Sequence, residues 1–254
     1  MRILVTNDDG INSLGLHALV RELEGEAETF VVAPEHERSA TGHAITLHKP
    51  LRAVPTILPE SNVKAWAING TPADCVALGV LELLPGRPHV VMSGINVGPN
   101  LGRDLTYSGT VSGAMEGTIF RIPSLAVSVG AFRDTIFEVA AGFAMRLVRQ
   151  VVERGLPENT LLNVNVPNLP KDQIKGVKIT RQGEKRYIST LDKRTDPRGR
   201  PYYWLTGAPA PQQDAEGTDS WALALGYISV TPIRLNMTDP DALEALAGWP
   251  LEIG

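Results

Sequence analysis

Short apolar runs alternate with segments of helical periodicity up to about residue 170, and this alternation restricts the possible folds more than any other feature of the sequence. Strands are predicted over residues 2–6, 28–34, 63–70, 88–96, 123–129 and 160–167, and helices over 14–23, 71–84, 109–122 and 134–154. Strand and helix units in this order build a mostly parallel sheet that helices cover on both faces. The sequence therefore predicts the α/β class, with a mostly parallel sheet flanked by helices.

Two regions depart from this alternation. Residues 38–58 show little helical periodicity and are expected to be extended chain. After residue 171 the sequence is rich in turn residues and in Lys and Arg, and the chain ends with an extended run over 227–235 and a short helix from Pro240. The basic start of this tail fits a solvated face, a subunit contact or a nucleic-acid patch. We interpret residues 1–254 as a single domain, with a core over about 1–170 and a C-terminal extended arm or hairpin with a final helix over about 171–254, used for oligomerisation.

Charge and cysteine content exclude several classes of protein. The formal net charge of −4 argues against a general nucleic-acid binder, because such proteins are normally basic. The single cysteine, Cys75, rules out an intramolecular disulfide and fits a reducing compartment. Polar residues from Thr6 onward interrupt the N-terminal apolar run too early for a signal peptide, and no run approaches the roughly 18 apolar residues of a membrane span. We therefore expect a cytoplasmic protein without a nucleic-acid or membrane partner.

Two adjacent carboxylates, Asp8 and Asp9, directly follow the first predicted strand. Burial of such a pair would raise at least one carboxyl pKa unless a cation compensates, and Mg²⁺ or Mn²⁺ prefers oxygen ligands of this kind. Ligands of parallel sheets bind at the carboxyl ends of strands. Ser39 and Asn96 follow two other predicted strands, so their oxygen atoms could join the same cation. The alternative is a polar turn that bends at Asp9 and caps the next helix.

The stretch PEHERSATGHAIT contains two histidines that resemble metal ligands at first sight. A zincin places two histidines four residues apart around a glutamate, and His36 and His43 do not have this spacing. Both are therefore expected to be loop residues rather than zinc ligands.

The stretch SGINVGPNLGRDLTYSGTVSGAMEG is dense in glycine and runs into a helix that begins near Ser108, Gly109 and Thr110. The free backbone N–H groups and the positive dipole end of such a helix start suit a phosphate. The chain has no Walker A loop, no G-x-G-x-x-G dinucleotide motif after the first strand, and no G-x-S-x-G elbow of serine hydrolases. A helix cap beneath a flexible loop is the alternative. Oxygen ligands for a cation beside an anion cradle suit metal-assisted hydrolysis of a phosphate ester.

The chain resembles the SurE family, the stationary-phase survival proteins with nucleotidase activity. The resemblance is carried in order by ILVTNDDGI, VVAPEHERSATGHAIT, NGTPADCV, VVMSGINVGPNLGRDLTYSGTVSGAMEG and ISVTPI. It implies a Rossmann-like core and a phosphatase that acts on nucleoside 5′- and 3′-monophosphates, with short polyphosphate as a further substrate of some members. It also implies one divalent ion per subunit, Mg²⁺ or Mn²⁺, and a homodimer or homotetramer built with a swapped C-terminal arm.

Carried over residue by residue, the resemblance implies the metal ligands Asp8, Asp9, Ser39 and Asn96 and the substrate-binding residues Ser108, Gly109 and Thr110. Asp9 and Asn96 are the expected catalytic residues. Asp9 would orient the attacking water, and Asn96 would stabilise charge on the phosphoryl oxygens. A phospho-aspartate intermediate stays open beside direct attack by water, although the chain has no D-x-D-x-T haloacid dehalogenase signature.

Two further positions carry implications from the same resemblance. Asp104 matches an acidic position suspected of a role in proton transfer. Arg234 stands where some members have a histidine that has been considered for catalysis, so either that histidine is dispensable or the arginine steadies the phosphate. We favour the first of these two interpretations.

A non-catalytic regulatory module is the alternative function. Receiver domains also bind Mg²⁺ through paired acids after their first strand, but they place an acceptor aspartate at the end of the third strand. The third predicted strand here ends in Asn69 and Gly70. A nucleotide-binding protein without catalysis is the other form of this alternative.

Overall fold

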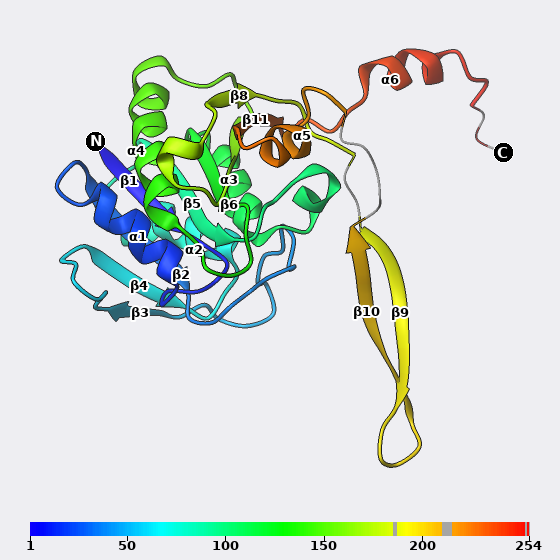
Figure 1. Ribbon diagram of the computed structural model, residues 1–254, viewed down its shortest axis with the longest axis horizontal. Coiled ribbons are helices and arrows are strands. Elements are labelled where there is room, and N and C mark those ends of the chain that lie inside the picture. The colour runs from blue at the N-terminus through cyan, green and yellow to red at the C-terminus, as the bar shows by residue number, and fades with distance from the viewer. Residues whose placement is uncertain (185–186, 210–214, 252, 254) are drawn as a thin grey trace.

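The computed structural model contains a nine-stranded sheet with helices on both faces and a separate two-stranded hairpin (Figure 1). It describes residues 1–184, 187–209, 215–251 and 253. The strands of the large sheet lie in the order β3-β4-β2-β1-β5-β6-β7-β11-β8. Their bounds are β1 (Arg2–Thr6), β2 (Glu28–Pro34), β3 (Ala53–Thr56), β4 (Lys64–Ile68), β5 (Val90–Val97), β6 (Ser124–Val129), β7 (Thr160–Val166), β8 (Val177–Ile179) and β11 (Ile228–Arg234). The predicted α/β class is confirmed.

The order of the strands creates a switch point between β1 and β5. All strands from β4 through β7 run parallel, while β3 and β11 pair antiparallel with β4 and β7. After β1 the chain first builds the side that contains β2 and β4, and then returns to place β5 on the other side of β1. Open α/β sheets bind ligands at such a point, outside the carboxyl ends of the strands. The ends of β1 and β5 are therefore the expected place for a site.

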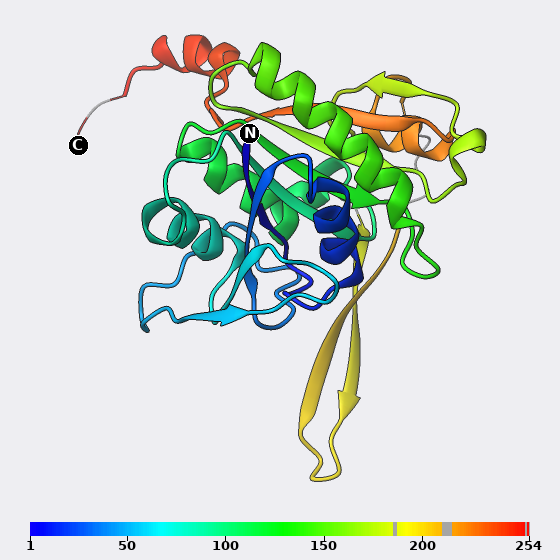
Figure 2. The same ribbon diagram turned by 90° about the vertical axis from the view of Figure 1, so that its left-hand side faces the viewer.

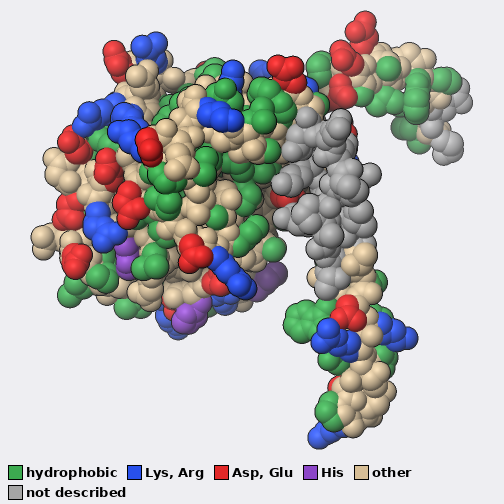
Figure 3. All heavy atoms as spheres, viewed as in Figure 1, with side chains coloured by type: hydrophobic (Ala, Val, Ile, Leu, Met, Phe, Trp, Pro, Cys, Tyr) green, Lys and Arg blue, Asp and Glu red, His purple; other side chains and the backbone are tan. Residues whose placement is uncertain are grey.

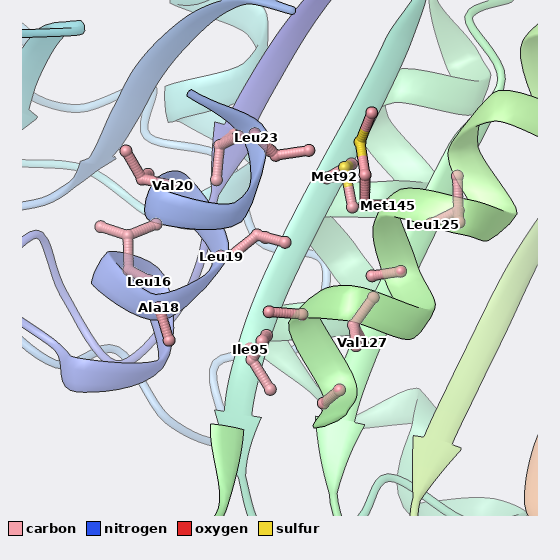
Figure 4. Packing of buried hydrophobic residues seen from close by; sticks show 14 of the residues in the cluster. Leu16, Ala18, Leu19, Val20, Leu23, Met92, Ile95, Leu125, Val127 and Met145 are labelled. Carbon is pink, nitrogen blue, oxygen red and sulfur yellow. The ribbon is translucent and has the colours of Figure 1, made fainter. Parts of the chain in front are cut away.

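Helices cover the two faces of the sheet in pairs (Figure 2). One face carries α1 (Leu14–Leu23) and α4 (Phe137–Arg154), and the other carries α2 (Pro72–Leu78) and α3 (Gly109–Ile119). Successive residues of β1 alternate between the two cores, because Ile3 and Val5 belong to the cluster under α1 and α4, whereas Leu4 belongs to the cluster under α2. Figure 4 shows the first core, where Leu19 of α1 and Met145 of α4 lie over β5 and β6.

Three predicted helices end or begin elsewhere in the structure. The helix predicted over 71–84 is α-helical only at its start and continues as a π-helix, η1 (Gly79–Leu83). The helix predicted over 109–122 ends at Ile119, because Arg121 has a φ of 57° and so cannot continue a right-handed helix. The helix predicted from residue 134 begins at Phe137, because Asp134 has a φ of 50° and the N-cap residue Ile136 is extended, with a φ of −92° and a ψ of 96°.

The segment after β7 contributes both to the sheet and to the arm. β8 and β11 extend the large sheet, and a short helix, α5 (Asp219–Ala224), packs beside β11. The sequence pattern predicted β11 as an extended run but predicted neither β8 nor α5. β9 (Tyr187–Thr195) and β10 (Pro201–Pro209) pair antiparallel in a hairpin that projects from the body, and α6 (Pro240–Ala247) stands off the core (Figure 1). The hairpin was predicted, while the boundary near residue 170 stays a prediction. Within the described residues, no helix has both the length and the apolar character needed to cross a bilayer.

Candidate active site

β1 ends in a mostly buried turn that the side chain of Asn7 shapes. The amide nitrogen of Asn7 donates to the Gly10 carbonyl (3.0 Å) and to the hydroxyl of Ser13 (2.7 Å), which is the N-cap of α1. Gly10 has a φ of +98° and lies against the backbone of His36, so a side chain at this position would be strained. The turn between Asn7 and Gly10 thereby presents the two acidic residues at the switch point.

Asp8 lies against the first turn of α3. Its Oδ1 accepts a hydrogen bond from the Thr110 hydroxyl (2.5 Å), and the backbone N–H of Thr110 also donates to the carboxylate. Glycine is required at position 109, because a Cβ there would lie 2.7 Å from the Asp8 Cβ and 2.8 Å from its Oδ2. Ser108 caps the helix by accepting from the Val111 N–H (3.1 Å). The three predicted phosphate contacts therefore adjoin a predicted metal ligand, and the anion at this helix terminus is the Asp8 carboxylate itself.

Burial raises the pKa of both carboxyl groups of the pair. Asp8 is only 4% exposed, and its desolvation raises its pKa more than the hydrogen bonds from Thr110 lower it. Desolvation, and next the charge of Asp8, raise the pKa of Asp9 to about 7. Asp9 Oδ2 is buried and has no hydrogen-bond partner among the described residues. A buried carboxylate beside a half-buried one with an unpaired, buried oxygen is an arrangement that a cation would stabilise.

The loop after β2 brings Ser39 to the same turn. The backbone N–H of Arg38 donates to the Asp8 carbonyl (2.7 Å), so the residue before Ser39 is fixed directly to the acidic turn. The Ser39 hydroxyl donates to Glu37 Oε1 (2.7 Å). Farther along the loop, the N–H and the hydroxyl of Thr46 donate to the Asp74 carboxylate of α2, and these hydrogen bonds hold the loop in place.

His36 and His43 lie in this loop, as predicted. His43 Nε2 contacts the Glu116 carboxylate of α3 at 2.8 Å. In the described part of the chain, His, Cys, Asp and Glu side chains form no cluster of three or more that would suit a metal. A zinc site of the histidine type therefore has no support in the residues that the structure describes.

Asn96 reaches the site from the end of β5. The register between β5 and β6 shifts between Gly94 and Asn96, and a bulge of this kind re-aims the side chains next to it. The Asn96 Nδ2 donates to the Gly98 carbonyl (2.8 Å), so the amide oxygen is the atom left to serve as a ligand. The backbone N–H of the following residue, Val97, lies close enough to the Asp9 carboxylate to lower its pKa in part. The ends of β1 and β5 thus meet at the acidic pair.

The four predicted ligands fit a hard divalent cation on chemical grounds. All of them offer oxygen atoms, which Mg²⁺ and Mn²⁺ prefer. Since only two are carboxylates, a cation here would also depend on the neutral oxygens of Ser39 and Asn96. The unpaired Asp9 Oδ2 supports this fit. The ligand roles themselves stay predictions.

A buried polar network holds the glycine-rich loop between β5 and α3. Asn100 donates through its backbone N–H to the Asn165 amide oxygen and through its side chain to the Ser128 hydroxyl (2.8 Å each). Its carbonyl accepts from the amides of Asn163 and Asn165 (2.9 Å each). This network was not predicted from the sequence. Its signal was present, because Asn163 and Asn165 alternate with apolar residues in a predicted strand, and a buried amide needs a partner.

Gly102 forms a second anchor for the same loop, with a φ of +55°. Its N–H donates to Asp219 Oδ2 (2.8 Å), and its carbonyl accepts from Gln182 Nε2 (2.7 Å). Asp219 is fully buried and also accepts from the N–H groups of Gly183 (2.9 Å) and Ser220 (2.8 Å). Gln182 and Asp219 belong to the two segments at the base of the hairpin, so the hairpin base supports the loop. Asp219 was not predicted as an anchor either, because its local sequence signal marks only the start of a helix.

The structure places Arg234 and Asp104, whose roles the family resemblance had left open, in different parts of the molecule. Arg234 pairs with Thr160, the first residue of β7, and is exposed. Because β7 runs parallel to β1, Arg234 lies toward the amino ends of the strands, at the sheet edge opposite Asp8. Asp104 lies half-buried in the 3₁₀ turn of the glycine-rich loop, η2 (Gly102–Thr106). A role for Asp104 in proton transfer stays a prediction.

Known proteins resemble this chain over nearly its whole length. The sequence model of the family described as "Survival protein SurE" matches residues 3–189. The chain belongs to the SurE family. The 5′-nucleotidase SurE of Heliobacterium modesticaldum is 51% identical over 249 residues, which cover 98% of this chain and 92% of that protein. The 5′-nucleotidase SurE of Geobacter metallireducens is 49% identical over 98% of this chain and 97% of its own length. The crystal structure of the SurE protein from Aquifex aeolicus matches with a TM-score of 0.84 at 43% identity, covering 97% of this chain and 98% of that one. These matches confirm the SurE resemblance that the motifs predicted.

Proposed function

We propose that this protein is a divalent-metal-dependent phosphatase that hydrolyses nucleoside 5′- and 3′-monophosphates to nucleoside and phosphate, with short polyphosphate as a further substrate. The observation that carries the proposal is the pair of buried Asp8 and half-buried Asp9, whose Oδ2 is itself buried and lacks a partner among the described residues and whose pKa is about 7. A cation would neutralise this pair of carboxylates, and a phosphate dianion could then bind between the cation and the helix N-terminus. SurE relatives at 51% and 49% identity bear the name 5′-nucleotidase, which supports a nucleoside monophosphate as the substrate.

In this proposal, one Mg²⁺ or Mn²⁺ ion per subunit, held by Asp8, Asp9, Ser39 and Asn96, supplies Lewis acidity and charge neutralisation for the attack of water on phosphorus. The Asp9 carboxylate orients the attacking water. The Asn96 amide and the positive end of the α3 dipole, at Ser108, Gly109 and Thr110, stabilise the negative charge on the phosphoryl oxygens. The hydrogen bond between Thr110 and Asp8 fixes the start of α3 to the metal ligands in the turn after β1.

Release of phosphate from AMP, measured colorimetrically with Mn²⁺ and with EDTA, tests the proposal. Wild-type protein should release phosphate only with the cation. Asp9→Asn should abolish release and keep the fold, whereas Asp172→Asn, at an exposed aspartate outside the site, should behave like wild type. Turnover by the Asp9 variant with Mn²⁺ present would contradict the assignment. Binding of Mn²⁺ and AMP by wild-type protein without phosphate release would favour the non-catalytic regulatory module.

We propose in addition that the protein forms a homodimer or homotetramer through its C-terminal arm. α6 has no buried residue, and Leu243 and Leu246 on it and Trp249 just after it are exposed. Figure 3 shows hydrophobic side chains gathered on this projecting segment. Tyr203 and Trp204 are exposed on the hairpin. Large apolar side chains gathered on a projecting segment support a contact surface. Light scattering of the full chain should give a multiple of the monomer mass, and a monomer at micromolar concentration would contradict the proposal.

We place the activity in the cytoplasm. Cys75 is a buried free thiol, which suits a reducing compartment. Cell fractionation that finds the protein outside the cytoplasm would contradict this placement.

A further inference from the structure

Glu37 is an acidic residue beside the site that the predicted ligand set does not use. The Ser39 hydroxyl donates to Glu37 Oε1 at 2.7 Å. Arg38, the residue between them, holds this part of the loop on the Asp8 carbonyl through its backbone N–H (2.7 Å). The negative charge of Glu37 also raises the pKa of both Asp8 and Asp9. Glu37 is therefore in direct contact with Ser39 and close to the acidic pair.

A serine hydroxyl has one hydrogen and two lone pairs. A cation binds a lone pair, so the hydrogen of a ligating hydroxyl must point toward another acceptor. A carboxylate at hydrogen-bond distance provides that acceptor and fixes the rotation of the hydroxyl. Residues behind the direct ligands orient many protein metal sites in this way.

We propose that Glu37 is a positioning residue for the cation, because its carboxylate holds the Ser39 hydrogen and leaves the hydroxyl oxygen free to bind the metal. The inference rests on the proposed function, since it requires Ser39 to be a ligand. It deepens that function by assigning Glu37 a role that acts through Ser39. If Glu37 instead only added negative charge near the cation, Glu37→Gln and Glu37→Ala would weaken Mn²⁺ binding equally.

Mn²⁺ affinity, measured by electron paramagnetic resonance of the free ion during titration of the full chain, tests this role without relying on activity. Glu37→Ala removes the acceptor and should weaken Mn²⁺ binding about 10- to 100-fold. Glu37→Gln loses the charge but keeps an amide oxygen that accepts the Ser39 hydrogen, so it should bind Mn²⁺ nearly as tightly as wild type. Glu35→Ala is the matched control, because Glu35 is an exposed acid of the same loop, and it should leave the affinity unchanged.

The double variant Glu37→Ala with Ser39→Ala separates the two roles. If Glu37 acts through Ser39, the double variant binds Mn²⁺ as weakly as Ser39→Ala alone. Losses that add in the double variant, or equal losses in Glu37→Gln and Glu37→Ala, would overturn the proposal in favour of a charge effect. Wild-type affinity in Glu37→Ala would overturn it as well. Thermal unfolding in EDTA shows that each variant is folded.

Failure of the proposed function would look different. Wild-type protein that binds no Mn²⁺, or that binds it and releases no phosphate from AMP, would refute the nucleotidase proposal, and the first of these results would also remove the basis for Glu37. Wild-type protein that binds Mn²⁺ and turns over AMP, together with an unaffected Glu37→Ala variant, would refute the role of Glu37 alone.

Discussion

Replacing Gly109 with alanine tests whether the reaction depends on the exact place of Asp8. Gly109 is the first residue of α3 and has no left-handed backbone angle, so alanine strains the chain only through its methyl group. That Cβ would lie 2.7 Å from the Asp8 Cβ and 2.8 Å from its Oδ2. Carbon atoms in contact normally lie about 3.5–4.0 Å apart. Either the helix start or the Asp8 side chain must therefore move by about 1 Å.

This displacement determines the losses of stability and of activity that we expect. Overpacking of this kind costs about 1–3 kcal/mol of unfolding free energy. A misplacement of about 1 Å at a reacting centre lowers the rate about 100-fold. The assays are phosphate release from AMP with saturating Mn²⁺ and urea unfolding in EDTA.

Two other glycines serve as matched controls. In Gly113→Ala, one helical turn along the same face of α3, the new Cβ meets Ser93 Oγ at 2.7 Å and Thr6 Cγ2 at 2.9 Å, so stability should fall by a similar amount while activity falls much less. In Gly142→Ala, within α4, the nearest atoms are side-chain ends at 3.5 and 3.6 Å, so stability should rise by about 1 kcal/mol. Wild-type activity in Gly109→Ala, with a loss of stability like that of Gly113→Ala, would refute the reasoning about Asp8.

Three further predictions address pH, the loop anchor and the far edge of the sheet. The pKa of Asp9 is about 7 in the folded protein and 3.8 ordinarily, so between these pH values the metal-free folded state holds more protons than the unfolded state. The stability of the protein in EDTA should therefore fall as pH rises from 4 to 7. Thermal melts of Asp9→Asn should show a weaker fall with pH, and equal slopes for the variant and wild type would contradict this prediction. Asp219→Ala leaves the buried N–H groups of Gly102 and Gly183 without their acceptor and should cost about 1–3 kcal/mol for each group in urea unfolding, with a smaller loss for Asp219→Asn. Arg234→Ala should keep wild-type phosphate release, because Arg234 lies at the opposite edge of the sheet, and a loss of more than about tenfold, or 1.4 kcal/mol of barrier, would contradict that placement.

The core of the fold was predictable because each of its elements carries a local pattern. The apolar runs of β1, β2, β5, β6 and β7 and the amphipathic helices α1 and α4 require only neighbouring residues to be recognised. β8 spans only Val177–Ile179 and is exposed, so it lacks the alternation that marks a strand. The place of β11 beside β7 could not be predicted either, since an antiparallel partner inserted at the edge of a parallel sheet depends on contacts between distant residues.

The same distinction applies to the candidate site. The positions of Asp8, Asp9 and Asn96 are predictable because the first two follow β1 and the third lies near the end of β5, and parallel strands bring their carboxyl ends to one edge. Asp219 was missed because its importance comes from a bond to Gly102, a residue 117 positions away. The contact between Thr110 and Asp8 was also unforeseen, since the sequence shows that a helix starts at Ser108 but not how closely that helix approaches β1.

The hairpin has a fixed base and a free end. Gln182 and Asp219 secure Gly102 at the base, while the tip is an exposed turn closed by the bonds of Asp196 with Gly199 and Arg200. Exposed loop tips accept added chain more readily than other positions. A fluorophore or an affinity peptide inserted at residues 196–200 would therefore leave the anchoring residues untouched. Light scattering of the labelled protein would then show whether the tip also lies outside the proposed subunit contact.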